Sequence, residues 1–478
     1  MSEPTFIRGL PIGGAWVPTP TRRPVLNPST GERIADAPWG GVEHFELAVA
    51  AAQAAFAKTR SQSAWERAEI LRRAADEIGR RRDAFVQYIV NEVGKPVTLA
   101  EAEVARAQAT FLTAADEARR TSGEVLSMDA FPAGRGHSGF TRRFPIGVIY
   151  GLTPFNFPLN LAAHKVAPAL AVGNTVILKP APKAPLTALL LAEALEAAGV
   201  VAGQLNVVTC SNEDAGHLVG DPRVNLTSFT GSPAVGWKLK ERCGRQRIVL
   251  ELGGNAAAIV HEDADLDQAV SAIASGGFGF AGQSCISVQR VLAHRPVYER
   301  FKEMLLSHIR EKVRVGDPWD RSALIGPMID GAAVERVSQI IARAVAGGAK
   351  LLAGGEARGL FMPATVLEDV DRSMEVCSQE IFAPVVVLQP YSRFEDALEM
   401  ANDSDFGLQA GVFTHDLRRA HQAFESLDVG AVLINNVPTF RVENMPYGGV
   451  KQSGFGREGV QYAMEEMTEI RSMIMKLG

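Results

Sequence analysis

The region between Gly147 and Gly254 constrains the fold most, because short apolar segments alternate there with longer helical ones. The apolar segments read as strands and are GVIYGL, TVILKP, LNVVTC, NLTSFTG and RIVLELGG. The segments that follow the first four read as helices and are LNLAAHKVAPALA, PLTALLLAEALEAAG, NEDAGHLVG and PAVGWKLKER. Strands that are apolar at every position are buried on both faces, as in a parallel sheet. The alternation therefore predicts an α/β fold with helices on both faces of the sheet.

The flanking regions extend this pattern. On the N-terminal side, long stretches such as SAWERAEILRRAADEIGRRRDAFVQYIVNEVG have apolar positions at helical spacing and are expected to pack beside the sheet. After Asn255 a second series of helical and extended segments begins, including DLDQAVSAIASGGF, ISVQRVLAH and VERVSQIIARAVAGGAK. Because 478 residues exceed what one core usually holds, we predict a second α/β domain, with ligands bound in the crevice between the two.

Two segments fit neither domain. GEVLSMD and HSGFTRRFPIG, joined by AFPAGRG, read as an extended hairpin, and the C-terminal EIRSMIMKLG reads as a lone strand. Unpaired strand edges favour association, so these segments are expected to form contacts between subunits. The alternative is an ordinary surface hairpin and tail.

Composition excludes several classes of protein. The formal net charge is -5 and the longest basic cluster is Arg80 to Arg82, so nucleic acid is not an expected partner. We see no secretory signal and no apolar run near the roughly 20 residues that span a bilayer, which favours a protein free of the membrane. The four cysteines lack CxxC or Cys/His spacing, so neither disulfides nor a metal site is expected, and a cytoplasmic location fits.

Cys285 and Glu251 are the candidate reactive pair. A thiolate attacks carbonyl carbons readily, and a carboxylate can take a proton from water to release an acyl group held by a thiol. Cys285 follows a glycine-containing loop, FAGQSC, and Glu251 lies at the end of a predicted strand before Gly-Gly. The alternative readings are a buried apolar cysteine, as expected for Cys210, and a solvated strand-end carboxylate.

The chain resembles the NAD(P)-dependent aldehyde dehydrogenase superfamily. The matching motifs occur in the family's order and are TPFNFPLN (153–160), LKP (178–180), FTGSPAVG (229–236), ELGGN (251–255), GQSC (282–285), EIFAP (380–384) and MPYGGVKQSGFGREG (445–459). Each motif alone is weak, but seven in order are specific. The resemblance implies the aldehyde dehydrogenase fold: a Rossmann-like cofactor domain, a second α/β catalytic domain and a small β oligomerisation element.

The resemblance also implies catalytic roles. Cys285 matches the nucleophile that attacks the aldehyde carbon, and Asn156 matches the amide that stabilises the resulting oxyanion together with the backbone N–H of the nucleophile. Glu251 matches the general base that activates water to hydrolyse the thioester. Members that pass the acyl group to coenzyme A generally lack a base here, so release to water is favoured.

For the cofactor, the resemblance implies NAD or NADP. Gly231 and Gly236 lie between a predicted strand and helix, where backbone amides can face a pyrophosphate, and Ser232 begins that helix. Lys179 matches the lysine that binds the adenosine ribose. The remaining residues assigned to the cofactor site are Thr153, Pro154, Phe155, Leu252, and Glu380 and Phe382, which match the residues at the nicotinamide ribose.

One departure bears on cofactor choice. NAD-selective members often carry Glu three residues after the lysine, where it repels a 2′-phosphate, whereas this chain has Pro182 followed by Lys183. NADP is therefore expected to be tolerated, and the preference between the two cofactors stays open. The alternative for Lys183 is a solvated surface charge.

The substrate is less constrained. The sequence looks most like the branch that includes the lactaldehyde, non-phosphorylating glyceraldehyde-3-phosphate, phosphonoacetaldehyde and succinic-semialdehyde enzymes. Arg441 and Arg106 are candidates to bind an anionic group, and Phe157 and Ser284 complete the proposed substrate site. Several acid-selective relatives have Arg immediately before the nucleophile, where this chain has Ser284, so neutral and anionic aldehydes both remain open.

The sequence thus predicts oxidation of a small aldehyde to its acid by a homodimer or homotetramer. Residues 1–122 and 146–253 are assigned to the dinucleotide-binding domain, 254–445 to the catalytic domain, and 123–145 with 466–478 to the oligomerisation element. The alternatives are a coenzyme A-acylating dehydrogenase and a non-catalytic binding protein on the same scaffold.

Overall fold

A computed structural model describes residues 8–477, and its first large sheet has six strands in the order β21-β11-β10-β7-β8-β9. The strands are β7 (Val148–Leu152), β8 (Thr175–Lys179), β9 (Leu205–Val207), β10 (Leu226–Thr230), β11 (Arg247–Glu251) and β21 (Gly454–Phe455). All of them pair in parallel except β21, which is antiparallel to β11. The predicted parallel sheet is therefore confirmed, and its carboxyl edge carries the residues just after each strand.

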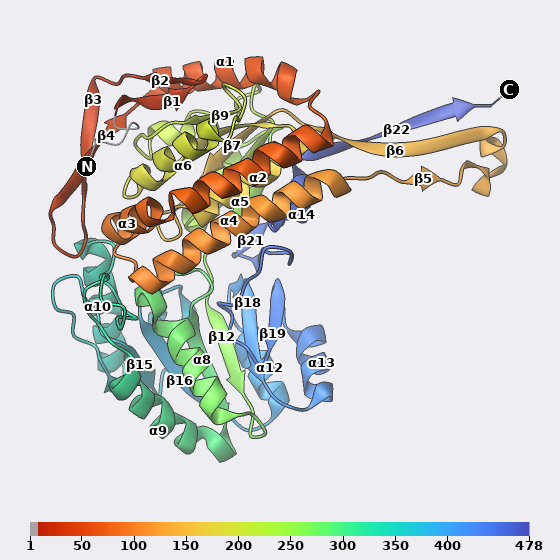
Figure 1. Cartoon of the computed structure of the whole chain (residues 1–478). Helices are drawn as coiled ribbons and strands as arrows, with labels where there is room; N and C mark the ends of the chain where they lie inside the picture. Colours follow the sequence, from red (N-terminus) through yellow and green to blue (C-terminus); the bar gives the residue numbers. More distant parts are fainter. Residues whose placement is uncertain (1–7, 478) are drawn as a thin grey trace.

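Helices pack on both sides of this sheet (Figure 1). They are α1 (Val42–Thr59), α2 (Ala64–Arg80), α3 (Arg82–Val93), α4 (Val97–Arg120), α5 (Asn160–Val172), α6 (Pro185–Ala197), α7 (Pro233–Arg242) and α14 (Val460–Glu466). Every residue of α5 is buried, because α5 lies between the sheet and the pair α2 and α4. The amphipathic stretch predicted as helical is divided at Arg81, whose backbone leaves the helical region.

One predicted helix is absent. The segment NEDAGHLVG forms only a 3₁₀ turn, Asp214–Gly216. Ser211 and Asp214 exchange hydrogen bonds at the start of the segment, and Gly220 has a positive φ of 85° at its end. These local bonds and the left-handed glycine leave room for a single turn.

The second large sheet has seven strands in the order β14-β15-β16-β13-β12-β18-β19. They are β12 (Ala256–Val260), β13 (Val288–His294), β14 (Lys350–Ala353), β15 (Thr365–Glu368), β16 (Val385–Tyr391), β18 (Gln409–Phe413) and β19 (Ala431–Ile434). The helices of this part are α8 (Leu266–Phe278), α9 (Arg295–Lys312), α10 (Gly331–Ala346), α11 (Glu375–Ser378), α12 (Phe394–Asn402) and α13 (Leu417–Ser426). All strands but β14 run parallel, so this part is a second α/β unit.

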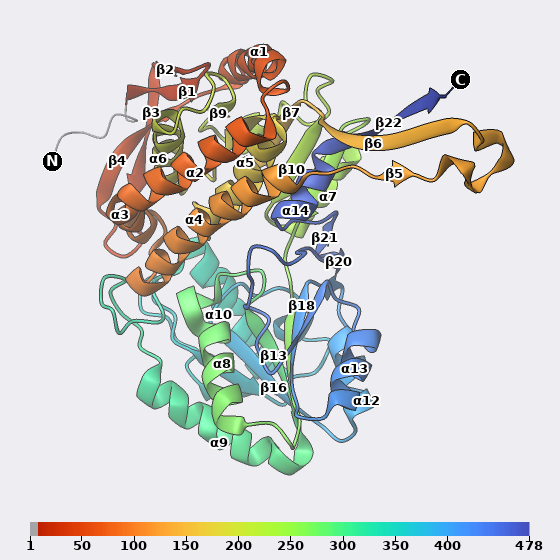
Figure 2. The same cartoon turned by 45° about the vertical axis from the view of Figure 1, so that its right-hand side comes forward.

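The predicted hairpin and C-terminal strand belong to one three-stranded sheet, β22-β6-β5. Its strands are β5 (Val125–Leu126), β6 (His137–Pro145) and β22 (Thr468–Lys476), and β22 pairs with β6 along its whole length. In Figures 1 and 2 this sheet projects away from the rest of the molecule.

Smaller elements complete the chain. Two-stranded pairs are formed by β1 (Leu10–Ile12) with β2 (Ala15–Val17), β3 (Thr21–Leu26) with β4 (Arg33–Trp39), and β17 (Phe406–Gly407) with β20 (Val450–Lys451). Among residues 8–477, no helix combines the length and apolarity that crossing a bilayer requires.

Candidate active site

Cys285 lies in the loop between the 3₁₀ segment Gly279–Gly282 and β13, where the two large sheets meet. The backbone before it is unusual, since Phe280 and Ala281 both adopt positive φ angles of 53° and 54°. A side chain at Gly282 would come within 2.1 Å of the carbonyl oxygen of Ala383. Gly282 of the GQSC motif therefore lets the loop approach the backbone at Ala383 closely enough to present Cys285.

The side chain of Cys285 is partly exposed and lines a cavity of about 250 Å³. All four residues predicted to bind substrate line the same cavity: Arg106, Phe157, Ser284 and Arg441. Tyr447 also lines it, with its Oη 3.2 Å from the Sγ of Cys285. Burial raises the pKa of Cys285 to about 12, and the hydrogen bond with Tyr447 opposes this rise. The structure thus brings the predicted nucleophile and substrate residues together.

Glu251 ends β11 and is buried. Neither of its carboxylate oxygens has a hydrogen-bond partner among the described residues. Burial and the negative charge of Glu458 raise the pKa of Glu251 well above its usual range, against the opposing charges of Arg441 and Lys165. A buried carboxyl group with a raised pKa and free oxygens has the properties of a general base.

Asn156 is buried, and its Nδ2 donates to the carbonyl oxygen of Gln283 at 3.0 Å, two residues before Cys285. This bond uses one of the two amide hydrogens and ties the side chain to the nucleophile loop. The Oδ1 atom is buried without a partner. The second amide hydrogen makes no hydrogen bond within the described part of the chain.

A chain of buried ionisable groups extends from Glu251 through residues that were not predicted from the sequence. Lys165 donates to Glu458 at 2.9 Å and also to Ser228 and Thr230. Burial opposes the ionisation of Glu458, but the charges of Lys165 and His164 hold the pKa of Glu458 well below its usual range. The sequence feature that could have indicated this chain is the adjacent ionisable pair His164 and Lys165 inside a largely apolar helix.

Glu443 continues this chain to the substrate cavity. It accepts from Nε of Arg106 at 3.0 Å, and its other oxygen lies 2.5 Å from Nε2 of His164. Burial works against ionisation of Glu443, yet the charges of His164 and Arg106 keep its pKa below the usual range. Arg106 is consequently neutralised by a partner that the sequence analysis did not foresee.

Arg441 has a different environment. Its guanidinium carbon lies 3.6 Å from the centre of the Tyr447 ring, and its side chain is only 5% exposed. The nearest carboxylate oxygen recorded is that of Glu458, 3.5 Å from Nη2, and Nε and Nη2 have no hydrogen-bond partner in the described part of the chain. Arg441 therefore offers unused donors beside the cavity.

The predicted cofactor residues gather at the carboxyl edge of the first sheet. Lys179 ends β8, is buried, and donates from Nζ to Asn212 at 2.7 Å. Burial lowers its pKa to about 8. Ser232 is the N-cap of α7, follows β10 and Gly231, and makes no side-chain capping bond. This is where ligands bind in parallel sheets.

Close packing explains the glycines of this loop. A Cβ atom at Gly236 would lie 2.4 Å from Leu252, and one at Gly231 would lie 2.5 Å from the ring of Phe229. Larger residues would therefore push α7 away from β11. Thr153 and Pro154 follow β7 at the same edge, and the Oγ1 of Thr153 is buried without a partner.

The residues expected at the nicotinamide ribose lie between the two sheets. Glu380 accepts from the backbone N–H of Gly254 at 3.0 Å, and burial raises its pKa to about 7. Phe382 has a positive φ of 54° and contacts Phe155 edge to face, with ring centres 6.1 Å apart. These contacts place Glu380 beside the Gly-Gly turn that follows Glu251.

Pro182 and Lys183 lie just before α6, beyond the end of β8. Lys183 is exposed and its Nζ lies 3.4 Å from Asp330, the N-cap of α10. Its charge is therefore shared with a carboxylate across the two parts of the molecule. This contact agrees with the alternative that Lys183 is a surface charge. Pro182 occupies the position where NAD-selective members often have the Glu that repels a 2′-phosphate.

Comparison with known proteins identifies the family. Residues 16–473 match the aldehyde dehydrogenase family. The chain is 42% identical over 470 residues to 3-sulfolactaldehyde dehydrogenase of Priestia megaterium, with 98% of each chain covered. Aldehyde dehydrogenase 21 from Physcomitrella patens, solved with the reaction product succinate, has a TM-score of 0.96, 39% identity and 98% coverage of both chains.

A third relative is glyceraldehyde-3-phosphate dehydrogenase from Methanocaldococcus jannaschii, solved as a complex with NADP. It has a TM-score of 0.91 and 36% identity, and the match covers 96% of this chain and 100% of the relative. The sequence motifs, the two α/β units and the cysteine cavity agree with these likenesses. The chain belongs to the aldehyde dehydrogenase family and is an oxidoreductase that oxidises aldehydes with NAD or NADP.

Proposed function

We propose that the physiological substrate is a small aldehyde carrying an anionic group, which this enzyme oxidises to the carboxylic acid. The observation that carries the proposal is Arg441, whose Nε and Nη2 are buried without hydrogen-bond partners among the described residues and whose side chain lines the cavity of Cys285. Buried guanidinium N–H groups without hydrogen-bond partners are costly even with the Glu458 carboxylate 3.5 Å from Nη2, and a carboxylate, phosphonate or sulfonate would satisfy them. The names of the relatives, which include sulfolactaldehyde and succinate-semialdehyde dehydrogenases, support this class.

In the proposed reaction the thiolate of Cys285 forms a bond to the aldehyde carbon, and the carbonyl electron pair moves onto oxygen. The amide of Asn156 and the backbone N–H of Cys285 stabilise that oxyanion, an interaction worth roughly 3–4 kcal/mol in the transition state. Bound NAD(P)+ supplies the acceptor for the hydride that leaves this carbon. Glu251 then takes a proton from water, which attacks the thioester of Cys285 and releases the acid and the thiol.

The residues at the sheet edge fit a dinucleotide. Lys179, Ser232 and the first backbone N–H groups of α7 provide donors for the ribose and pyrophosphate, and Glu380 provides an acceptor. The unpartnered hydroxyl of Thr153 supports this assignment, because a buried hydroxyl without a partner is unusual. Leu252 and Gly236 set the spacing of the helix.

A matched pair of aldehydes tests the substrate proposal. Succinic semialdehyde and butanal have chains of similar length and differ in the terminal carboxylate, so the ratio of their kcat/KM values measures the contribution of that charge. We expect Arg441→Gln to lower kcat/KM for succinic semialdehyde by roughly 30-fold or more and to leave butanal within about 3-fold, since truncating one partner of a buried charge pair costs about 2–5 kcal/mol. Arg300→Gln, at an exposed position of α9, is the control.

Equal losses for both aldehydes would contradict the anion-binding role, because Arg441 would then support Tyr447 alone. Equal kcat/KM values for both aldehydes in the unmodified enzyme would contradict the substrate class. Phosphonoacetaldehyde and lactaldehyde, assayed with each cofactor, would extend the comparison to other charges and lengths.

We also propose the domain division made from the sequence and an assembly through the β22-β6-β5 sheet as a homodimer or homotetramer. The side chains of Ile470 and Met473 on β22 are more than half exposed, and Val125 on β5 is 88% exposed. A projecting sheet with exposed apolar side chains supports contact with a second copy. Ile470→Glu should reduce the mass in solution, as measured by light scattering. An unchanged mass would contradict this surface.

A cytoplasmic location is proposed as well. The four cysteines are all free thiols, as expected in a reducing compartment.

A further inference from the structure

The second α/β unit has two edges, and the reaction uses only one of them. Cys285 and Asn255 precede β13 and β12, so the active site lies at the amino ends of these strands. The strand order β16-β13-β12-β18 reverses direction at β12, which is the first of them in the chain. In doubly wound sheets, ligands bind at the carboxyl ends of the strands near such a reversal. That edge lies across the sheet from Cys285.

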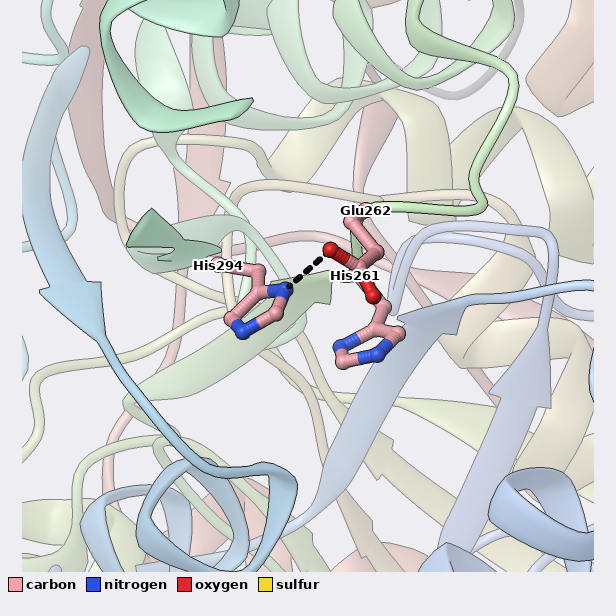
Figure 3. Close-up of side chains that lie close together, drawn as sticks. All are labelled: His261, Glu262 and His294. Carbon is pink, nitrogen blue, oxygen red and sulfur yellow. Dashed lines mark ion pairs between the residues drawn. The ribbon is translucent and has the colours of Figure 1, made fainter. Parts of the chain in front are cut away.

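Three potential metal ligands meet at this carboxyl edge: His261, Glu262 and His294. Each residue offers one ligand atom, and these three atoms all lie within 4.8 Å of one another. His261 and Glu262 follow β12 directly, and His294 ends β13. Figure 3 shows the two imidazole rings next to each other, with the carboxylate of Glu262 reaching toward the gap between them. The adjacent parallel strands therefore deliver ligands from two separate segments of the chain.

The surroundings of His294 indicate which of its nitrogens carries a proton. Nε2 lies 2.9 Å from the carbonyl oxygen of Ser392, which can only accept, so Nε2 carries the hydrogen in that bond. Nδ1 is buried without a hydrogen-bond partner in the described chain and lies 3.6 Å from Oε2 of Glu262. An imidazole lone pair that faces a carboxylate is unfavourable unless a cation lies between them. A second N–H held by a backbone carbonyl is typical of metal-binding histidines.

His261 supplies a second unused nitrogen. Its side chain is 3% exposed, and its Nδ1 lies 2.7 Å from the hydroxyl of Tyr391. That hydroxyl donates to the carbonyl oxygen of Val260, so it can accept from Nδ1. Nε2 of His261 then keeps its lone pair, and it is buried with no partner in residues 8–477. A buried imidazole and a partly exposed one, each with an unused lone pair beside one carboxylate, form a recognisable set of metal ligands.

We propose that His261, Glu262 and His294 bind one divalent transition-metal ion, zinc being the best match to two imidazoles and a carboxylate, with water completing the coordination. Bonds of about 2.0–2.2 Å require the ligand atoms to approach one another further. The half-exposed side chain of Glu262 is free to move, and the stacked rings of His261 and His294, with centres 4.4 Å apart and planes at 12°, must also turn for both lone pairs to meet at one ion. The ion would join the ends of β12 and β13. It would take no part in the chemistry of Cys285, which lies at the opposite ends of these strands.

Cobalt(II) is the first probe, because a four-coordinate site gives intense visible absorption bands, whereas the octahedral aqueous ion absorbs only weakly. The full-length enzyme, without a polyhistidine tag and stripped with a chelator, is titrated with cobalt(II) and then with zinc(II) as competitor. We expect one ion per chain with a dissociation constant in the micromolar range or below. The melting temperature should rise on binding, while aldehyde oxidation stays within about 2-fold.

The variants His294→Gln and Glu262→Gln test the ligands, because both side chains are partly exposed and their replacement leaves the core intact. Each should weaken cobalt(II) and zinc(II) binding by at least about 10-fold. His421→Gln, on the surface of α13, is the matched control and should bind as the unmodified enzyme does. Unchanged affinity in both ligand variants would overturn the proposal. The absence of saturable cobalt(II) binding would overturn it as well. A doubly protonated His294, detected by NMR, would then show that a proton and not a metal ion neutralises Glu262.

Discussion

The hydroxyl of Tyr447 lies 3.2 Å from the Sγ of Cys285, and the face of the same ring contacts the guanidinium of Arg441 at 3.6 Å. One aromatic side chain therefore connects the nucleophile to the cation proposed to bind the substrate. Burial is the main cause that raises the pKa of Cys285, the charges of Glu380 and Glu251 raise it further, and the bond from Tyr447 stabilises the thiolate that must form. Tyr447 thus partly offsets the cost of forming a buried thiolate at Cys285.

Replacing Tyr447 by Phe should make the thiol harder to ionise. The ring and its contact with Arg441 remain, but the hydrogen bond that lowers the pKa of Cys285 is lost, so that pKa rises further. A hydrogen bond to a charged group is worth about 1.5–3 kcal/mol, so alkylation by iodoacetamide at fixed pH should slow by roughly 10-fold or more. Tyr462→Phe, on α14, is the control. An unshifted pH profile of alkylation would contradict the role of Tyr447.

Replacing Cys285 by Ala should abolish aldehyde oxidation while dinucleotide binding persists. The proposed covalent intermediate cannot form without the thiol, so kcat should fall by at least about 1000-fold. Fluorescence titration with NADPH measures the binding that remains. Cys243→Ala, at a buried position after α7, should retain turnover. Near-normal activity in the Cys285 variant would remove the assignment of the nucleophile.

Replacing Glu251 by Gln should separate the two halves of the reaction. Hydride transfer should remain, whereas hydrolysis of the thioester should slow by about 100-fold or more, giving a burst of reduced cofactor and then slow turnover. The raised pKa of Glu251 means that the base form increases as pH rises, so deacylation in the unmodified enzyme should accelerate with pH. The variant should lack this acceleration. Identical steady-state kinetics in the variant, or turnover of the unmodified enzyme that requires coenzyme A, would argue against Glu251-activated water.

Replacing Glu443 by Gln should change the preferred charge of the substrate. Glu443 forms a hydrogen-bonded ion pair with Arg106, and its loss would leave Arg106 as well as Arg441 without a hydrogen-bonded carboxylate at the cavity. We expect KM for a dianionic aldehyde such as glyceraldehyde 3-phosphate to fall by about 5-fold or more relative to that for succinic semialdehyde. Glu465→Gln, on the exposed face of α14, should show no such change. If both KM values rise together, Glu443 supports the structure of the site without setting its charge preference.

Replacing Pro182 by Glu should move cofactor preference toward NAD. The new carboxylate would lie beyond the end of β8, where it would repel a 2′-phosphate while accepting from ribose hydroxyls. KM for NADP should rise by roughly 10-fold or more, and KM for NAD should stay within about 2-fold. Lys183→Ala separates the contribution of the neighbouring cation, which is already paired with Asp330. Equal use of both cofactors by the Pro182 variant would show that discrimination lies elsewhere.

Much of the fold could be predicted because its signals are local. The strands at 148–152 and 175–179 are mostly apolar and buried at every position, and the helix at 160–172 lies between them in the chain, so parallel pairing was foreseeable. The segment around Asp214–Gly216 was misjudged, because its helical composition loses to a local Ser211–Asp214 hydrogen bond and a left-handed glycine.

The sequence alone determined the family, the cysteine at 285 and the carboxylate at 251, because seven motifs in a fixed order carry that information. The tertiary structure decided which charges remain available. Arg106 and Arg441 look equivalent in the sequence, yet Glu443, which lies 337 residues from Arg106 in the chain, forms a hydrogen-bonded ion pair only with the former. Pairing across such distances depends on which side chains the packed helices and strands bring within a few ångströms, and one-dimensional spacing contains no measure of that distance.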